Sequence, residues 1–254
     1  MTNAMDWQDR GLIIGVRKHG ETSVILEVLT QAHGRHMGLV RGGRSRSMQP
    51  MLQAGNSVDL TWRARLEEHL GTFVVEGERL RAAHLMQSAL GLHGLHHMTG
   101  LLRLLPERDP HPELWRFAEV LADQVGHAAL GPVLMLRFEL ALLAELGFGL
   151  DLSECTLTGA REDLVYVSPK SGRAVARSAG EPWRDRLLPL PAFLLVEEHE
   201  ADADQLRNAF RLLEHFLTRD VLAPRGLAIG ASRSAFQAEA EKALRRSAVA
   251  TAST

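Results

Sequence analysis

The first eighty residues alternate between short apolar, β-branched runs and glycine-containing breaks. Breaks with the sequences HGE at 19–21 and QAHG at 31–34 separate the first three runs. Short strands joined by such turns predict a small antiparallel barrel or sandwich. Five strands match the count of an OB-fold barrel, although SH3-like barrels have a similar count. The predicted strands are 10–18, 22–30, 35–41, 56–65 and 72–78.

The hydrophobic period then changes from that of strands to that of helices. Leu114, Ala118, Leu121 and Val125, together with Phe117, follow the spacing of one helix face. Pro112 precedes this face, at a position where a missing N–H costs little. The other predicted helices lie within 85–105, at 132–146, along an apolar stripe from 206 to 217, and at 234–246.

Between residues 151 and 188 the helical pattern is interrupted. The segments DLVYVS and GRAV predict a small hairpin around the turn SPKSG, with Leu164, Tyr166 and Val175 buried. The fold class expected is therefore α+β and multi-domain, with a five-stranded barrel of OB-fold or SH3-like type followed by a helical domain that carries this inserted hairpin. The predicted divisions are a nucleic-acid-binding domain at 1–81, a helical domain at 82–247 and a flexible tail at 248–254.

Composition excludes several classes of protein. With 45% hydrophobic and 24% charged residues, the chain is typical of globular proteins. Cys155 is the single cysteine, which excludes an internal disulfide and a multi-cysteine metal site. The N-terminal MTNAMDWQDR lacks the apolar segment of a signal peptide, and no apolar run has the length of a membrane span. We therefore expect a soluble cytoplasmic protein, associated with the nucleoid if it binds DNA.

Charge is distributed unevenly despite a net value of -2. No Asp or Glu occurs from Val28 to Val58, and the segment 34–47, GRHMGLVRGGRSRS, contains four arginines and four glycines. Such a segment is either a flexible phosphate-contacting loop or a solvated loop with an accidental charge cluster. The flanking strands favour the first interpretation, because a barrel with a basic face is a common single-strand binding design.

Other predicted strands carry cations that extend this surface. Because aromatic residues near it are few, namely Trp7, Trp62 and Phe73, we expect mainly electrostatic binding with weak sequence specificity. The predicted DNA-binding residues are Arg17, Lys18, Arg35, Arg41, Arg44, Arg46, Arg63 and Arg65.

The sequence gives little support for a catalytic site or a metal-binding site. His93, His96 and His97 form a cluster that could bind a metal, but no carboxylate nearby completes a ligand set, so surface or interhelical histidines are favoured. GASRS at 230–234 is not a nucleophile elbow, and no phosphate-binding glycine motif occurs. We predict no catalytic residue, no metal and no cofactor.

Several segments resemble the RecO family of bacterial recombination mediators. These are GLIIGVRKHGETSVILEVLTQAHGRHMGLVRGGRSR near the N-terminus, LLRLLPERDPHPELWRFAEVLADQV, and RFELALLAELGFGLDLSECTLTG at 137–159. The third is the most specific, because it contains an F-E-x-x-x-L-x-x-x-G run leading into a cysteine motif. RLLEHFLTRDVLAPRGLAIGASRS near the C-terminus is a looser match.

The resemblance implies an N-terminal OB-fold, binding of single- and double-stranded DNA, and annealing of complementary strands. It also implies contacts with the single-strand binding protein SSB and with RecR. Members of the family help RecA to displace SSB from single-stranded DNA. SSB tails are acidic with an apolar end, so their docking groove is expected to have a basic rim, with Arg103, Arg116 and Arg137 as candidates.

One departure from the family concerns zinc. Many members carry two C-x-x-C pairs that hold a structural zinc ion. Here Cys155 keeps the first position, but Thr158, Ala176 and Ala179 occupy the others. One thiolate cannot form a closed tetrahedral site, so the region 151–188 is expected to be a zinc-motif remnant without zinc, and Cys155 a small core residue.

Two other functions remain open. The chain could be a protein-interaction module, an adaptor for SSB and RecR with weak or no DNA binding of its own. A hydrolase that uses the histidine cluster is the third class, and it would require a bound metal.

Overall fold

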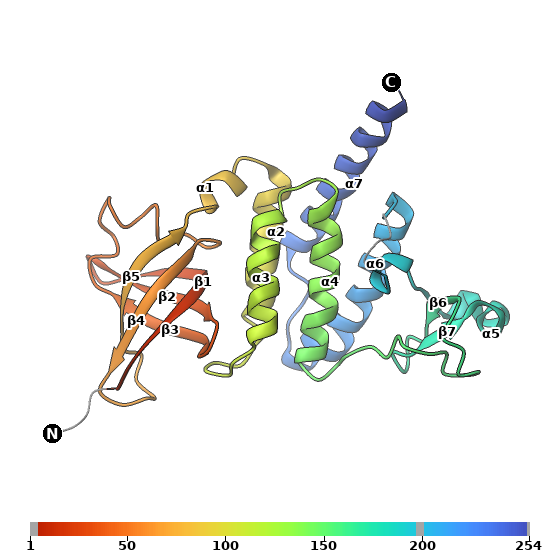
Figure 1. The fold of residues 1–254 in the computed structure, drawn as a ribbon, viewed down its shortest axis with the longest axis horizontal. Coiled ribbons are helices and arrows are strands. Elements are labelled where there is room, and N and C mark those ends of the chain that lie inside the picture. The colour runs from red at the N-terminus through yellow and green to blue at the C-terminus, as the bar shows by residue number, and fades with distance from the viewer. Residues whose placement is uncertain (1–4, 197–200, 253–254) are drawn as a thin grey trace. The chain divides into compact units, whose positions relative to one another are not determined.

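The computed structural model describes residues 5–196 and 201–252, and in it the chain forms two compact units, 1–126 and 127–254. The first unit contains a closed five-stranded barrel with the strand order β1-β2-β3-β5-β4. Figure 1 shows the barrel strands and the three helices that follow them. The elements of this unit are β1 (Met5–His19), β2 (Ser23–Thr30), β3 (Gly34–Val40), β4 (Ser57–Ala64), β5 (Thr72–Arg79), α1 (Ala82–Leu85), α2 (Ala89–Leu102) and α3 (Pro112–Gln124).

The predicted five-stranded barrel is thus confirmed. Its strands are antiparallel neighbours except for β3 and β5, which meet in a parallel contact at Leu39 and Thr72. Alternate side chains of each strand point inward and form one apolar core. This core contains Ile13, Val24, Leu26, Val28, Val40, Leu52, Val58, Leu60, Trp62, Phe73 and Val75.

Ion pairs join the barrel to the helices of the first unit. Glu27 on β2 accepts hydrogen bonds from Arg103 at the end of α2, at 2.9 Å, and from Arg35, at 2.7 Å. On another side, Glu119 of α3 accepts from Arg81 at 2.9 Å and from the hydroxyl of Ser57 at 2.6 Å. The predicted domain boundary after residue 81 follows the change from strands to helices, and it falls inside this compact unit.

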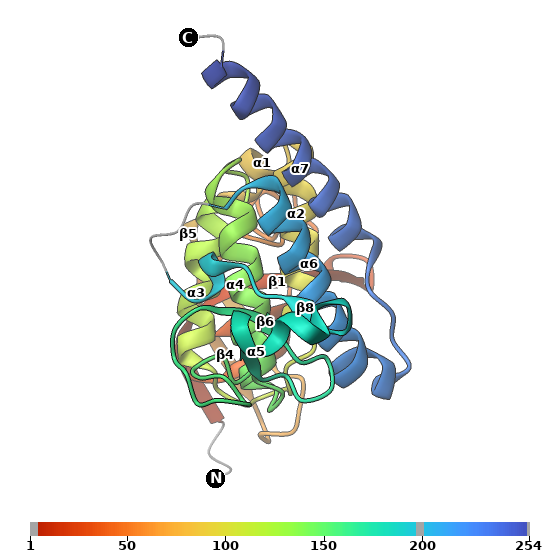
Figure 2. The ribbon, with the colours of Figure 1, turned by 90° about the vertical axis from the view of Figure 1, so that its right-hand side faces the viewer.

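The second unit combines helices with a three-stranded sheet in the order β7-β6-β8. Figure 2 shows the strands β6 and β8 beside α6. The predicted hairpin corresponds to β6 and β7, while β8 was not predicted. The elements are α4 (Leu130–Glu145), β6 (Leu164–Val167), β7 (Ala174–Ala176), α5 (Arg177–Gly180), η1 (Glu181–Arg186), β8 (Leu188–Pro189), η2 (Ala192–Leu194), α6 (Ala203–Phe216), the π-helix η3 (Leu217–Leu222), η4 (Ala223–Arg225) and α7 (Ala231–Ala252).

The structure differs from two expectations for this unit, the burial of Tyr166 and the flexible tail. Leu164 and Val175 are buried as predicted, but Tyr166 is only half-buried because its hydroxyl reaches outward to donate to Glu181 at 3.2 Å. The helix α7 continues to Ala252 and so covers most of the predicted tail 248–254, of which residues 253–254 lie outside the described residues.

A buried arginine connects three helices of the second unit. Arg233 of α7 is 1% exposed and donates to both carboxylate oxygens of Glu139 on α4, at 2.9 and 3.0 Å. It also donates to the Phe210 carbonyl and to Glu214, both on α6. Burial alone would lower the pKa of Arg233, but the two carboxylates raise it, so the guanidinium stays charged.

Replacing this arginine should destabilise the protein strongly. Arg233→Met would leave the carboxylate of Glu139 buried without a counter-charge, which typically costs about 3–5 kcal/mol of unfolding free energy. Chemical denaturation followed by circular dichroism measures the loss. Arg245→Met, on an exposed part of the same helix, is the control and should change stability by less than about 0.5 kcal/mol. Equal effects of the two substitutions would contradict the structural role of Arg233.

His36 is a polar side chain inside the barrel. It is 3% exposed, and its ring contacts those of Trp7, Trp62 and Phe73 edge-on. Neither ring nitrogen has a hydrogen-bond partner in the described part of the chain. Burial, and then the charges of Arg108 and His33, lower its pKa from 6.5 to about 4.

The barrel should therefore lose stability in acid because of His36. The unfolded chain takes up a proton near pH 6.5 while the folded protein does not, so the unfolding free energy falls between about pH 6.5 and pH 4. Over that window the loss attributable to this residue is about 3 kcal/mol. Denaturation at several pH values should show a flatter profile for His36→Phe than for wild type. His33→Gln is the control, and an equal flattening there would contradict the assignment.

Candidate nucleic-acid interface

One end of the barrel gathers most of the predicted basic residues. Lys18 on β1 is opposite Val24 on β2, which is opposite Val40 at the end of β3. This register brings the end of β1 to the start of the loop that follows β3. Arg44 in this loop donates from its backbone to Thr22 at 3.0 Å and from its guanidinium to the Gly20 carbonyl at 2.9 Å. Two cations thus lie at the end of β1 and three in the loop after β3, which this register places beside it. We call these five residues, Arg17, Lys18, Arg41, Arg44 and Arg46, the basic barrel end.

The loop between β3 and β4 is hydrogen-bonded along its length, whereas the sequence suggested a flexible loop. Backbone N–H groups of Ser45, Met48 and Leu52 donate to carbonyls three or four residues earlier. Leu52, 3% exposed, anchors the loop in the barrel core. At Gly43 a Cβ atom would lie 2.6 Å from Val24, so only glycine allows this close approach. The arginines are therefore held on an ordered support.

A depression of about 490 Å³ lies at the basic barrel end. Its floor is apolar, while Lys18 and Arg44 supply positive charge and two glutamines supply amide groups. Guanidinium and ammonium groups suit phosphate oxygens, and amides can pair with the edges of bases. The lining residues are Val16, Lys18, Val24, Gly43, Arg44, Gln49, Leu52 and Gln53.

Three predicted residues lie away from this end. Arg35 is half-buried, and its guanidinium already donates to Glu27, Glu107 and the Leu105 carbonyl. Arg63 on β4 is exposed, but its register partners are Asp6 on β1 and Thr72 on β5. Arg65 is also exposed, just beyond the end of β4. Arg35 is the one predicted DNA-binding residue that forms an ion pair within the described part of the chain. The other seven form none there.

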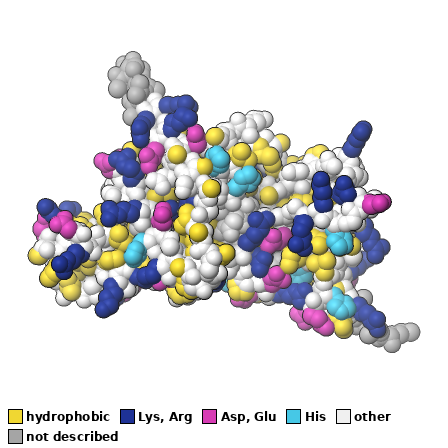
Figure 3. All heavy atoms as spheres, turned by 180° about the vertical axis from the view of Figure 1, so that it is seen from behind, with side chains coloured by type: hydrophobic (Ala, Val, Ile, Leu, Met, Phe, Trp, Pro, Cys, Tyr) yellow, Lys and Arg dark blue, Asp and Glu magenta, His cyan; other side chains and the backbone are white. Residues whose placement is uncertain are grey.

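The barrel also has an acidic side. Asp59 of β4 lies directly opposite Glu76 of β5, and both line a hollow on the outer surface with Asp9 and Arg10 of β1. Arg10 is paired with Glu78. Carboxylates on this side repel phosphate, so a polyanion is directed to other parts of the barrel. Figure 3 shows Lys and Arg side chains in several separate groups over one face of the molecule.

The scarce aromatic residues form one cluster. The ring of Trp7 stacks on His33 at 4.0 Å between centroids and on Trp62 at 5.6 Å. Phe73 contacts the same indole edge-on. Because both faces of Trp7 are covered, it serves barrel packing and offers no face to a nucleobase. His33, with a third of its side chain exposed, ends the stack.

An apolar groove of about 350 Å³ lies in the second unit between α4 and η2. Of the three arginines considered for a basic rim, Arg137 lines this groove. Its guanidinium donates to the carbonyls of Phe193, at 2.8 Å, and Val196, at 3.0 Å. Arg103 is bound to Glu27, and Arg116 is paired with Glu113. The other lining residues are Leu140, Ala141, Ala144, Phe193, Leu194, Leu195 and Val196.

The remnant of the cysteine motif keeps a knuckle-like backbone around Cys155. The thiol is 2% exposed. Burial raises its pKa, but hydrogen bonds from the Ala176 backbone, the Thr158 hydroxyl and the Leu157 backbone outweigh burial and lower the pKa to about 7. The residues at the other three motif positions do not fit a structural zinc ion, because Ala176 and Ala179 have no donor atom and a threonine hydroxyl is a poor zinc ligand.

The histidine cluster lies on α2. His97 is buried, His93 is half-buried and His96 is exposed, so the three side chains do not share one environment. Throughout the described residues, no group of three or more His, Cys, Asp or Glu side chains is placed to hold a metal ion. None of the helices within the same described residues is long and apolar enough to cross a membrane.

A closed five-stranded barrel in one unit, and helices with a three-stranded sheet in the other, define the class of proteins that combine an OB-like barrel with a helical domain. Two family models match the chain, "Recombination protein O N terminal" over residues 5–79 and "Recombination protein O C terminal" over 92–226. The chain belongs to the RecO family of DNA repair proteins, which are non-catalytic recombination mediators.

Curated relatives named "DNA repair protein RecO" are similar over nearly their whole length. The relative from Rhizobium leguminosarum bv. trifolii is 59% identical over 241 residues, 94% of each chain. Those from Agrobacterium fabrum and Sinorhizobium medicae are 56% and 55% identical, over 96% and 95% of this chain and 96% and 97% of theirs.

Proposed function

We propose that this protein binds single- and double-stranded DNA through the basic barrel end and anneals complementary strands. The observation that carries the proposal is the convergence of five exposed cations without ion pairs, held by a hydrogen-bonded loop. Guanidinium groups at this end neutralise the phosphates of two strands, so that complementary bases can meet. Base pairing in the product duplex then drives the reaction, and no bond chemistry is needed.

The family context supplies the partners of this proposal. With RecR, the protein would help RecA load onto single-stranded DNA covered by SSB. The groove next to Arg137 supports a contact with SSB, because an apolar chain end fits its aliphatic walls while the guanidinium faces acidic groups. The RecR contact rests on family membership alone.

Neutral substitutions at the basic barrel end should weaken DNA binding. Arg41→Gln, Arg44→Gln and Arg46→Gln combined remove up to three phosphate contacts, so the log-log salt slope should fall by about 2. Fluorescence anisotropy of labelled single-stranded DNA across a salt series measures this slope. Arg79→Gln with Arg116→Gln is the matched control, since both arginines are exposed and already paired. Circular dichroism verifies that each variant is folded.

Either of two results would count against DNA binding at this end. An unchanged slope in the folded triple variant would place the DNA elsewhere on the molecule. Absence of binding by the wild-type protein at low salt would favour the alternative function, a protein-interaction module for SSB and RecR.

Filling the groove should abolish docking of the SSB tail. Ala141→Phe places a ring between the walls of the groove and leaves Arg137 in place. We expect at least a tenfold loss of affinity for a peptide with the acidic, apolar-ended SSB sequence, measured by anisotropy. DNA affinity should not change. A peptide lacking its apolar end is the ligand control, and equal binding of both peptides would show that the groove is not used.

A further inference from the structure

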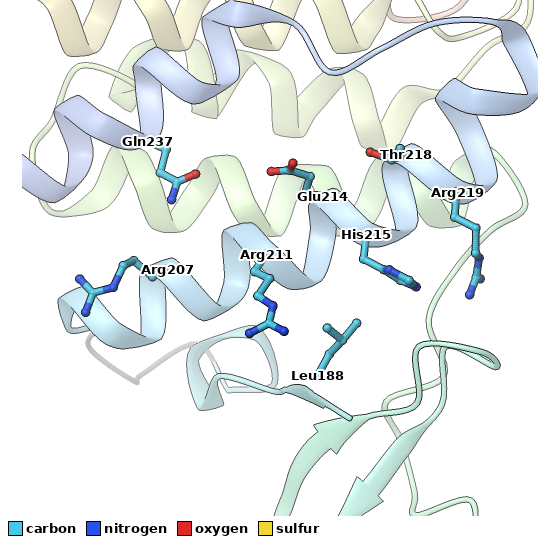
Figure 4. A pocket seen from close by; sticks show the side chains of 8 residues that line it. All are labelled: Leu188, Arg207, Arg211, Glu214, His215, Thr218, Arg219 and Gln237. Carbon is cyan, nitrogen blue, oxygen red and sulfur yellow. The ribbon is translucent and has the colours of Figure 1, made fainter. Parts of the chain in front are cut away.

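A row of basic side chains on α6 and η3 has no role in the function proposed above. Arg207, Arg211, His215 and Arg219 are spaced four residues apart. In an α-helix each such step advances about 6 Å and drifts about 40° around the axis. After Phe216 the helix widens into the π-helix η3, whose larger turn reverses this drift. Figure 4 shows Arg211, His215 and Arg219 projecting to the same side of the helix.

This row borders a hollow of about 550 Å³. Figure 4 shows Arg211 directed toward Leu188 of β8, while Glu214 projects from another side of α6. The ring of His215 is engaged with the Pro169 carbonyl at 3.0 Å. The Thr218 hydroxyl and the Gln237 amide also line the hollow, and each can both donate and accept hydrogen bonds.

Among the described residues that line the hollow, Glu214 is the one carboxylate, and it is already engaged. Glu214 accepts a hydrogen bond from the buried Arg233 at 2.9 Å. Arg219 is engaged as well, since two of its nitrogens donate to Asp220 at 2.6 and 2.7 Å. Its third nitrogen donates to the carbonyls of Pro169 and Lys170. Arg219 therefore holds the β6–β7 turn and contributes positive charge rather than free donors.

Two arginines remain available for a ligand. Arg211 forms no ion pair within the part of the chain that the structure describes. Arg207 is paired with Asp204, but both side chains are exposed, at 45% and 79%. Exposed pairs contribute little stability, so a multiply charged anion can compete for this guanidinium. Arg207 and Arg211 lie on consecutive turns, at a spacing comparable to that of neighbouring phosphates on a single strand.

An exposed indole lies on the segment that leads into the hollow. Trp183 of η1 is 51% exposed, and the guanidinium of Arg186 lies over its ring at 5.7 Å. Two residues after Arg186 the chain reaches Leu188, which lines the hollow. An exposed indole with one arginine neighbour is a stacking platform for a nucleobase, a group that an acidic peptide lacks.

We propose that this surface is a second nucleic-acid site, with Arg207 and Arg211 on the phosphates of a single strand and Trp183 under a base. The ligand class is that of the proposed function, on which this inference rests, but the surface belongs to the other compact unit. One chain then contacts single-stranded DNA through both of its units, each with its own phosphate-binding side chains.

The test uses the full-length chain carrying Arg207→Gln and Arg211→Gln. Anisotropy of labelled single-stranded DNA should show a salt slope lower by about 1.4 and a roughly tenfold loss of affinity at low salt. Arg161→Gln with Arg245→Gln is the matched control, because these arginines of the same unit are 80% and 70% exposed and lie outside the hollow. The control should bind as wild type does.

A second variant tests the stacking platform. Trp183→Ala should lower single-strand affinity roughly tenfold, with little change in the salt slope. In the wild-type protein, photo-crosslinking of iodouracil-containing DNA should label the peptide that contains Trp183.

The outcomes separate this inference from the proposed function. If the barrel-end triple variant loses affinity while Arg207→Gln/Arg211→Gln and Trp183→Ala bind as wild type, this inference is overturned and the proposed function stands. If wild type does not bind DNA at all, both fail. If Arg207→Gln/Arg211→Gln loses binding of an acidic peptide but not of DNA, the surface is a protein contact and the inference is wrong.

Discussion

The buried pair between Arg233 and Glu139 determines which faces of the helical unit are free. It fixes the start of α7 against α4 and α6, and the guanidinium donates four hydrogen bonds in fixed geometry. Glu139 lies on the side of α4 opposite to Arg137 and Ala141, so the ion pair turns these residues outward to form the groove. The same arginine also donates to one carboxylate oxygen of Glu214, which lines the hollow on α6.

Where the charged side chains lie on the barrel affects the binding of a polyanion more than the barrel's net charge does. The basic barrel end and the acidic hollow around Asp59 and Glu76 belong to the same small sheet. Barrel closure separates them, because β1 is long enough to pair with β2 near Lys18 and with β4 near Asp6. A polyanion that approaches this barrel is therefore attracted by the positive potential of the basic barrel end and repelled by the negative potential of the acidic hollow. This favours binding at the basic barrel end.

Local patterns predicted most of the fold. Short apolar, β-branched runs separated by turn-like breaks located all five barrel strands. Helical periodicity located α3 and α6, and the Pro132 and Gly147 boundaries located α4. The interaction of Glu139 with Arg233 could not be predicted, because the two residues are 94 positions apart and neither has a local signal of burial. The π-helix and the strand β8 were missed for a similar reason, since each depends on hydrogen bonds and neighbours rather than on composition.

The candidate site was predicted in part. The cations at the ends of β1 and β3 could be grouped because hairpin strands place their ends together. The separate position of Arg63 depends on the register by which β4 closes the barrel. Arg35 was included for its charge, but Glu27 and Glu107 engage it from segments that sequence reasoning did not place beside it.

The knuckle around Cys155 is held together by the protein's own backbone and side chains. Hydrogen bonds from Ala176 and Thr158 now surround the sulfur, while Val167, Ala174 and Val175 pack the small sheet beneath it. Folding of this region therefore depends on side chains that are present from the moment of synthesis. We therefore expect the protein to fold under zinc starvation and a chelator to leave its thermal unfolding unchanged.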